Sequence, residues 1–317
     1  MEARTPAVAV ITRTKNRPLL LERAIKSVLN QSFNDFIMVI VNDGGEQKSL
    51  NRLVKKYLAQ SEGRIQLLHN PKSLGMEVAS NIGIKNSKSK YVALLDDDDS
   101  WHEDFLRETV GYLNETGNKG VVTASEIVHE TIRGNSMHEN SRARFMPEIK
   151  NINLFTLAGR NIFPVNTFVY AREVFKKIGY YDENMKVVGD WDFNIRFIQR
   201  YNIGFINKPL AYYHQRTDTE GQIANSIVAD NTEHWQAINY VLNKYMRADL
   251  DSGKIGMGLI TNLSHNFSSL MQRQDNLTQA HINNLTNIIK NLEHQLNNHK
   301  GSKPWTRLIK VKRRIKS

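Results

Sequence analysis

Cysteine does not occur among the 317 residues of the chain, which excludes a disulfide-stapled fold, a thiolate zinc site and a cysteine nucleophile. Long apolar runs are also missing, since none approaches the roughly 18–20 residues that cross a bilayer. The N-terminus has an acid at position 2 and a short apolar stretch, which predicts a first strand and no signal peptide. With 40% apolar residues, 18 Gly and 7 Pro, the composition is that of a folded protein of roughly two domains, most simply cytosolic.

The net charge of +11 is concentrated at the C-terminus. Residues 300–317 hold eight Lys and Arg and no acid, so that 35 basic and 32 acidic residues remain in 1–299. Residues 1–299 are therefore nearly neutral and show no basic face interleaved with aromatic residues. This pattern predicts that the protein does not bind nucleic acid. Apolar and basic residues are mixed along 305–316. We expect residues 302–317 to attach peripherally to an anionic membrane surface, the alternative being a disordered, solubilising end.

The first half of the chain alternates buried strands with amphipathic helices, which predicts an α/β fold with a mostly parallel, Rossmann-like sheet. The expected strands are Ala7–Thr12, Phe36–Val41, Arg64–His69 and Tyr91–Leu95, and the expected helices are 18–31, 49–59 and 75–85. Ligands of such sheets bind beyond the carboxyl ends of the strands. Thr12, Arg13, Asn42, Asp43 and the run Asp96–Asp99 therefore gather at one edge.

Residues 119–215 mix strand and helix patterns, and strand signals fade after about residue 231. Over 259–296 candidate core positions recur with a mean spacing of 3.7, and Gln274 and His281 interrupt the otherwise apolar stripe. This spacing favours a straight or slightly right-handed helical bundle over a heptad zipper. Two interpretations stay open for the helical segment 254–299: a stalk that makes a homo-oligomer, or a helix that packs on its own domain.

Four consecutive aspartates, Asp96–Asp99, directly follow a buried strand and are closed by Trp101. Such runs are usually solvated loops. Here the carboxylates crowd at a sheet edge, and their pKa values would rise unless a cation compensates them. Oxygen ligands with no Cys nearby suit Mg²⁺ or Mn²⁺ bound together with phosphates of a substrate. We therefore interpret the run as a metal–diphosphate site.

Five further residues are candidates for chemistry. Asp43 closes the second strand, either as a turn residue or as an acceptor for a nucleobase N–H. Asp190, beside Trp191 at a helix start, is either a helix cap or a partly desolvated general base. His214 is either structural or a ligand for a diphosphate or metal. Arg13 and Arg17 could contact phosphate, or be solvated.

These motifs together resemble family 2 glycosyltransferases of GT-A fold. The segments that carry the resemblance are VAVITRTKNRP, AIKSVLNQSF, IVNDGG, NPKSLGMEVASNIGI, YVALLDDDDSWHEDFL, FVYAREVFKKIGYYDENMKVVGDWDFNIRF and GFINKPLAYYHQR. They extend over residues 5–216. The resemblance implies an inverting, Mn²⁺- or Mg²⁺-dependent enzyme that takes a UDP-sugar.

By this resemblance Asp43 holds the uracil and Asp190 is the base. Asp97 and Asp98 fall on the motif that touches ribose and metal, with Asp96 as the alternative because four adjacent aspartates allow more than one register. The full expected set for the nucleotide sugar is Thr12, Arg13, Arg17, Asp43, Asn81, Asp96 and Asp97, with Asp98 and His214 on the metal. Gly189 stands where the family's Glu-Asp-Trp/Tyr pattern has Glu, which leaves acceptor positioning open.

The expected domains are a catalytic domain 1–230 (nucleotide-sugar half 1–118, acceptor half 119–230), a helical extension 231–300 and a basic tail 301–317. The predicted reaction is sugar transfer to a hydroxyl of a glycan, of the lipid-linked O-antigen or capsule precursor class, at the inner face of the cytoplasmic membrane. A metal-dependent nucleotidyl or phosphoribosyl transferase and a non-catalytic membrane scaffold are the alternatives.

Overall fold

The computed structural model describes residues 5–134, 136–216 and 231–298. By its internal contacts the chain forms two compact units, Met1–Ser264 and His265–Ser317. The basic tail 301–317, with its predicted membrane contact, lies outside the described residues. The predicted partition at residues 230 and 300 stays a prediction. Within the described ranges, no helix combines the length and the apolar character needed to span a bilayer.

The alternation predicted for the N-terminal half is confirmed. The elements are β1 (Val8–Thr14), α1 (Pro18–Leu29), β2 (Phe36–Asp43), α2 (Gln47–Ser61), β3 (Ile65–Asn70), α3 (Met76–Lys85), β4 (Tyr91–Leu94), β5 (Ser100–Trp101) and α4 (Phe105–Thr116). Local chemistry sets the helix starts: Pro18 occupies the first turn of α1, where its missing N–H is not needed. The Glu46 side chain accepts hydrogen bonds from two backbone N–H groups that begin α2.

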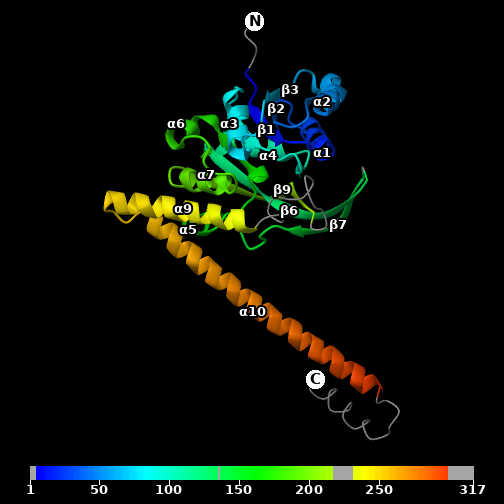
Figure 1. Cartoon of the computed structure of the whole chain (residues 1–317), viewed down its shortest axis with the longest axis vertical. Coiled ribbons are helices and arrows are strands. Elements are labelled where there is room, and N and C mark those ends of the chain that lie inside the picture. The colour runs from blue at the N-terminus through cyan, green and yellow to red at the C-terminus, as the bar shows by residue number, and fades with distance from the viewer. Residues whose placement is uncertain (1–4, 135, 217–230, 299–317) are drawn as a thin grey trace. The chain divides into compact units, whose positions relative to one another are not determined.

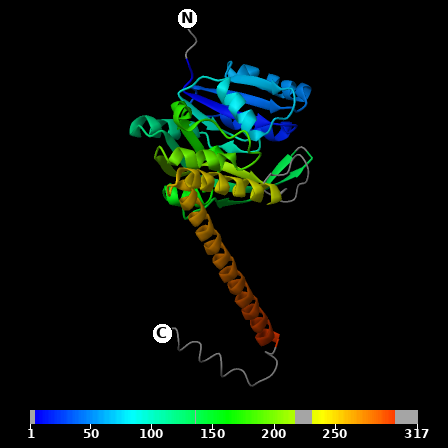
Figure 2. The ribbon, with the colours of Figure 1, turned by 60° about the vertical axis from the view of Figure 1, so that its left-hand side comes forward.

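The second half completes the sheet. Its elements are β6 (Gly120–Arg133), β7 (Ser136–Arg144), α5 (Leu154–Gly159), β8 (Phe168–Ala171), α6 (Phe175–Ile178), α7 (Gly189–Ile198) and β9 (Ile203–Gln215), with short 3₁₀ turns at Val165–Thr167 and Arg172–Val174. The strand order is β3-β2-β1-β4-β8-β6-β9-β5, and β7 pairs with β6. Figure 1 shows β6 and β7 side by side as a long hairpin, and Figure 2 shows the same ribbon turned by 60°, with the N-terminal elements drawn in blue.

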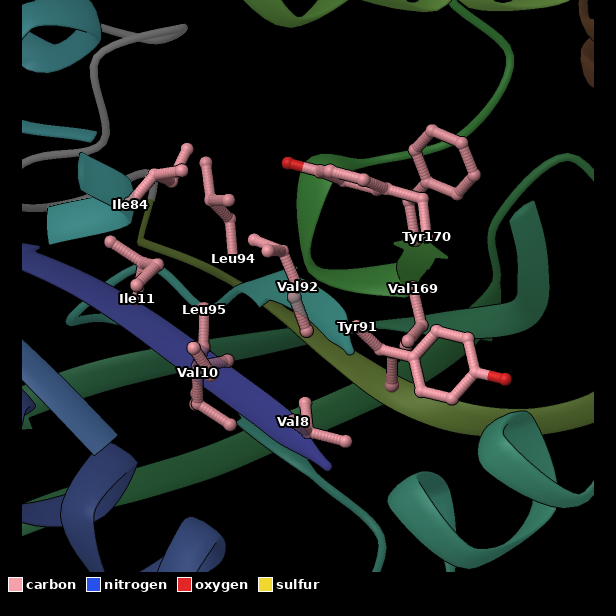
Figure 3. Packing of buried hydrophobic residues seen from close by; sticks show 14 of the residues in the cluster. Val8, Val10, Ile11, Ile84, Tyr91, Val92, Leu94, Leu95, Val169 and Tyr170 are labelled. Carbon is pink, nitrogen blue, oxygen red and sulfur yellow. The ribbon is translucent and has the colours of Figure 1, made fainter. Parts of the chain in front are cut away.

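The central strands are buried on both faces, as the continuous apolar runs predict. Val8 and Val10 of β1 and Val92 of β4 are fully inaccessible to solvent. Figure 3 shows these side chains packed together with Val169 and Tyr170 of β8. Because β1, β2 and β4 are parallel, this core holds their carboxyl ends in register at one edge of the sheet.

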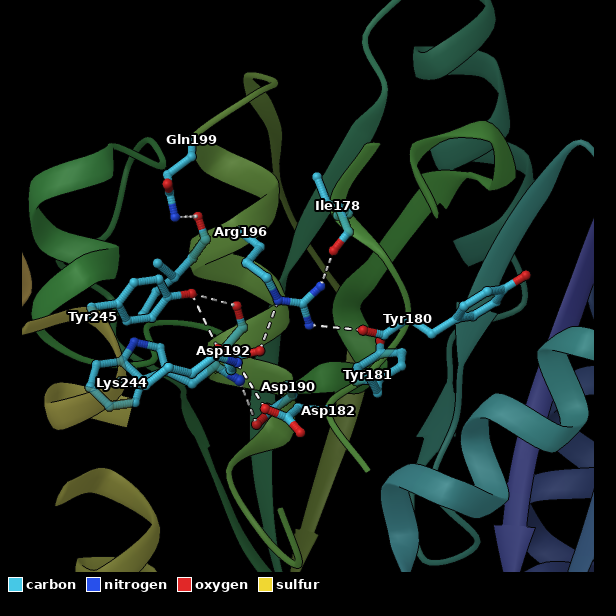
Figure 4. A network of polar contacts seen from close by, with 12 residues as sticks. Ile178, Tyr180, Tyr181, Asp182, Asp190, Asp192, Arg196, Gln199, Lys244 and Tyr245 are labelled. Atoms are coloured by element: carbon cyan, nitrogen blue, oxygen red, sulfur yellow. Dashed lines mark hydrogen bonds and ion pairs between the residues drawn. The ribbon is translucent and has the colours of Figure 1, made fainter. Parts of the chain in front are cut away.

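A network of ion pairs joins α7 to α9 (Asn231–Ser252). The Asp192 carboxylate is fully buried and accepts from Arg196 Nε at 2.8 Å and Lys244 Nζ at 2.9 Å. Lys244 Nζ also lies 2.8 Å from the carboxylate of Asp182, and Figure 4 shows this network. Of the two aspartates at this helix start, Asp192 is therefore the paired one, and α9 is fixed to the first unit.

The long helix expected near the C-terminus is α10 (Met257–Asn298). Its apolar residues beyond residue 264 are largely exposed in the described structure: Phe267, Leu270, Met271, Leu277, Ile282, Leu285, Ile288, Ile289 and Leu292. An exposed apolar stripe of this length is unusual for a single surface helix.

We expect Asp192→Asn to lower the free energy of unfolding by about 2–3 kcal/mol, because it removes the charge that two cations share. Arg196 and Lys244 keep 19% and 32% of their side chains exposed, which holds the loss at the lower end of the range for buried pairs. Urea unfolding followed by tryptophan fluorescence measures it. Asp251→Asn, at an exposed acid of α9, is the control, and equal stability of the two variants would contradict the prediction.

Candidate active site

The acidic run that follows β4 is divided among separate partners. Arg13 binds Asp96 Oδ1 through Nε and Nη2, both at 2.9 Å. Asp97 accepts from Thr14 Oγ1 at 2.7 Å and lies 3.3 Å from Arg17 Nη1. Burial, opposed by Arg17 and reinforced by the neighbouring aspartates, raises the pKa of Asp97 to about 7. The predicted edge residues Arg13, Arg17, Asp96 and Asp97 thus do lie together.

Asp98 and Asp99 connect the run to the end of β9. Arg17 Nη1 lies 3.2 Å from Asp98 Oδ2, and the fully buried Arg216 reaches the same oxygen at 2.5 Å. Asp99 accepts from the backbone N–H of His214 at 3.0 Å, and burial raises its pKa well above the ordinary value. Asp99 therefore has a structural task, whereas Asp98 lies between two guanidinium groups at the edge.

The donor set fits a divalent cation in part. Asp97 and Asp98 offer oxygen ligands, and burial, with a smaller contribution from the charge of Asp98, raises the pKa of Asp97, an effect that a bound cation would offset. In the described ranges, no three His, Asp or Glu side chains are grouped to hold a metal. A cation at Asp97 and Asp98 would therefore take further ligands from bound phosphates, as Mg²⁺ commonly does.

His214 is held by the protein at both ring nitrogens. Nε2 lies 2.8 Å from Ser100 Oγ, and Nδ1 lies 3.0 Å from Glu130 Oε2. Burial lowers the pKa of His214 although Glu130 opposes this, so the ring is neutral at pH 7. Ligation of a metal by His214 stays a prediction, and it would require exchange of the bond to Ser100.

Asp190 lies in the first turn of α7, which begins after Val188 in a left-handed backbone conformation with φ of 65°. Asn161 Nδ2 donates to Asp190 Oδ2 at 2.7 Å, and the Trp191 N–H donates to Oδ1 at 2.8 Å. Burial raises the pKa of Asp190 above its usual range even though these bonds and Arg13 oppose it. Asp190 is half-buried, which is the partly desolvated environment expected beside Trp191.

Arg13 joins this carboxylate to the acidic run. Burial opposes the charge of its guanidinium, but Asp96, Glu77 and Asp190 together raise the pKa of Arg13. The Glu77 carboxylate lies 3.8 Å from Arg13 Nη1, and Ser80 Oγ accepts from the same nitrogen at 2.7 Å. Asp96 and Asp190 therefore act on one cation, and the two clusters predicted from the sequence belong to one region.

Asp43 organises the loop that leads from β3 to α3. Its carboxylate accepts from Asn70 Nδ2 at 2.9 Å, Ser73 Oγ at 2.8 Å, Leu74 N at 2.9 Å and Gly75 N at 3.1 Å. Burial opposes ionisation, but these bonds lower the pKa of Asp43. The carboxylate is thus ionised and fixed at the carboxyl end of β2. Its contact with a base stays a prediction.

Asn81 and Thr12, which are predicted to contact the nucleotide sugar, are both buried in the protein. Asn81 donates to Tyr181 O and to Glu183 Oε1, both at 2.9 Å, and accepts from the Tyr181 N–H at 3.1 Å. Thr12 is fully buried, and its Oγ1 has no hydrogen-bond partner within the described part of the chain. In this conformation Asn81 fixes the segment 181–183, and the roles of both residues toward a nucleotide sugar stay predictions.

Sequence reasoning missed two buried acids, Glu77 and Glu130. Burial opposes ionisation of Glu130, but hydrogen bonds from His214 and Arg23 lower its pKa to about 2. It also accepts from Arg216 at 2.8 Å. The only signal in the sequence was an acid at an inward position of a strand or helix, and this signal does not reveal partners 84–107 residues away.

We expect Asp43→Ala to open the loop 70–75, because the Leu74 and Gly75 N–H groups lose their acceptor at a cost of about 2 kcal/mol. Trypsin should then cleave the native protein after the exposed Lys72 roughly tenfold faster or more. Glu62→Ala, at an exposed acid, is the matched control. Unchanged cleavage after Lys72 would contradict the prediction.

Comparison with known proteins identifies the family of the chain. Residues 9–179, more than half of the chain, match the family "Glycosyl transferase family 2". An uncharacterized glycosyltransferase of Rickettsia typhi is 27% identical over 209 residues, which are 65% of this chain and 63% of that protein. A PGL/p-HBAD biosynthesis glycosyltransferase of Mycobacterium bovis is 26% identical over 193 residues, 60% of this chain and 69% of that one. The chain thus spans slightly less than two thirds of the Rickettsia relative.

Solved structures share the fold. S. aureus TarS in complex with UDP-GlcNAc aligns with a TM-score of 0.60 at 16% identity, over 82% of this chain and 70% of that one. The mannosyltransferase PcManGT of Pyrobaculum calidifontis, in complex with GDP-Man and Mn²⁺, aligns with a TM-score of 0.55 at 16% identity, over 77% and 65%. The α/β sheet flanked by helices is therefore the GT-A type that the sequence predicted, and the chain belongs to glycosyl transferase family 2.

Proposed function

We propose that the protein is an inverting glycosyltransferase that moves a sugar from a UDP-sugar to a hydroxyl of a glycan acceptor, with Asp190 as general base. The observation that carries the proposal is the shared cation: Arg13 binds Asp96 of the acidic run and interacts with Asp190. A donor held at the acidic run would thus lie in the same region as the half-buried carboxylate of Asp190. Family membership favours this over nucleotidyl or phosphoribosyl transfer.

The donor side rests on the sheet edge. Asp43 is ionised and could accept from a uracil N–H, while Arg13 and Arg17 supply positive charge near a diphosphate. The remaining proposed donor contacts are Thr12, Asn81, Asp96 and Asp97. TarS structures contain UDP and UDP-GlcNAc, which supports a UDP-sugar, and the GDP-Man complex of PcManGT makes GDP-sugars the natural competitors to test.

The chemistry requires one base. Asp190 takes the proton of the acceptor hydroxyl while its oxygen bonds to the anomeric carbon, and the bond from that carbon to the UDP oxygen breaks with its electron pair leaving on UDP. Attack opposite the leaving group inverts the anomeric centre. Mn²⁺ or Mg²⁺, held by Asp98 and Asp97 with His214 as a further proposed ligand, would offset the charge that UDP gains. Arg17, 3.2 Å from Asp98, adds positive charge at the same place.

We propose a lipid-linked glycan, of the O-antigen or capsule precursor class, as the acceptor. The mixed basic and apolar tail 302–317 would then hold the enzyme on the anionic inner face of the cytoplasmic membrane. We further propose that the exposed stripe of α10 pairs with a second copy of the chain, since nine large apolar residues between 267 and 292 remain exposed and the helix carries few charges.

The catalytic prediction is tested by UDP release with a panel of UDP- and GDP-sugars, in Mn²⁺ and in EDTA. We expect Asp190→Ala and Asp98→Ala each to lower kcat by about 10²–10⁴-fold, the usual contribution of a general base or of a charged group on the leaving diphosphate. EDTA should abolish turnover. Asp251→Ala is the control, and metal-independent turnover, or full activity in both site variants, would reject the mechanism.

Calorimetric titration with UDP and Mn²⁺ separates the two roles. Asp190→Ala should leave the affinity unchanged, because the base acts on the acceptor, whereas Asp98→Ala should weaken it. Equal losses would argue against distinct donor and acceptor functions.

The pairing of α10 with a second copy and the membrane contact of 302–317 are tested with two variants. Each variant should change one property and leave the other unchanged. Leu277→Lys combined with Leu285→Lys should reduce the mass measured by sedimentation velocity to that of one chain, because it places charges on the apolar stripe that would be buried between two copies. The same variant should still float with phosphatidylglycerol vesicles. Deletion of 302–317 should abolish flotation and leave the mass unchanged. A monomeric wild type refutes the stalk, and flotation without the tail refutes the membrane contact.

A further inference from the structure

Glu77 of α3 fills the space beside the start of α7. A Cβ placed on Gly189 would lie 2.4 Å from Glu77 Cδ and 2.5 Å from Oε1, closer than real Cβ atoms approach. The Gly189 N–H donates to the Glu77 carboxylate. Glu77 therefore occupies, from another helix, the volume that a side chain at position 189 would take, next to Asp190.

Burial of the Glu77 carboxyl beside Gly189 costs folding free energy. Only 3% of the residue is exposed, and its Oε2 has no hydrogen-bond partner within the described residues. Burial raises the pKa of Glu77 to about 7, and Arg13 only partly offsets this. A buried acid that is incompletely satisfied is retained at functional sites more often than in a purely structural core.

The surroundings of Glu77 explain what its charge can do. Arg13 of β1 lies 3.8 Å away, and Asp190 and Asp96 face it as like charges. The buried phenols of Tyr170 and Tyr181 also interact with it. Arg13 thus divides its charge between Asp96 and Glu77. Among the described residues no cation forms a close ion pair with Asp190, which would otherwise make it a weaker base.

We propose that Glu77 is a positioning residue for Asp190: it fixes the turn at Gly189 through the backbone N–H and keeps the Arg13 guanidinium from pairing with the base. The proposal rests on the proposed function. It also accounts for Gly189, since the carboxylate that the Glu-Asp-Trp/Tyr pattern carries at this position is supplied here from α3.

The first test compares the full chain with Glu77→Gln, using UDP-GlcNAc or the best donor of the panel, Mn²⁺, and water or octyl glycosides as acceptors. We expect kcat to fall about tenfold or more while the donor KM stays within about twofold. The acid limb of the pH–rate profile should move to lower pH, because loss of a neighbouring negative charge and release of Arg13 both favour ionised Asp190. Glu62→Gln is the matched control.

The second test moves the carboxylate back. Gly189→Glu alone should be destabilised, because Glu77 fills the space, and Glu77→Ala alone should be slow. The combined variant Glu77→Ala with Gly189→Glu should recover stability and most of kcat. A helix-capping role alone would change the melting temperature and leave the pH profile of the remaining activity in place.

The inference is overturned if folded Glu77→Gln keeps the wild-type kcat and pH profile, or if the combined variant regains stability without turnover. If wild-type protein releases no nucleotide from any donor, the proposed function fails and the inference fails with it. Full activity of Asp190→Ala would reject the assignment of the base and this inference with it, while nucleotide release by the wild type would still support sugar transfer.

Discussion

A single buried guanidinium, that of Arg13, allows several carboxylates to share a desolvated region. Asp96 lies at 2.9 Å and Glu77 at 3.8 Å, and Asp190 interacts with the same cation. Without Arg13 the repulsion among these groups, in a low-dielectric surrounding, would force one or more to take up protons. The proposed donor and acceptor halves of the site therefore depend on one residue at the end of β1.

A second network stabilises the other side of the acidic run. Glu130 of β6 accepts from Arg23, His214 and Arg216, and Arg216 continues to Asp98. Charge alternates along this path, so each buried ion is compensated and hydrogen-bonded. The end of β9 is thereby tied to the proposed metal ligand, which makes Asp98 sensitive to any change in the position of that strand.

The order of strands and helices in the N-terminal half could be predicted because each signal is local: buried runs, Pro18, and polar residues where strands end. The clustering of Arg13, Asp43 and Asp96 followed from the geometry of parallel strands alone. The antiparallel β8 and the pairing of β6 with β9 depend on contacts between distant segments, which periodicity does not report. For the same reason the proposed role of Glu77 was not predicted, since it depends on the contact of Glu77 with Gly189, 112 positions later in the sequence.

Individual side-chain roles in the site were harder to foresee than its location. Four adjacent aspartates look alike in sequence, yet Asp99 supports β9 while Asp97 and Asp98 meet Arg17. Asn81 and His214 carry suitable chemistry, but protein partners occupy their polar atoms. What distinguishes these residues is the direction in which each side chain points, and this is decided by tertiary packing.

The left-handed backbone at Val188, with φ of 65°, has an evolutionary consequence. A β-branched residue in this region is strained by roughly 1–2 kcal/mol, and glycine or asparagine would adopt it more readily. Selection for stability alone should therefore favour glycine or asparagine at position 188, unless the strained turn is needed to place Asp190.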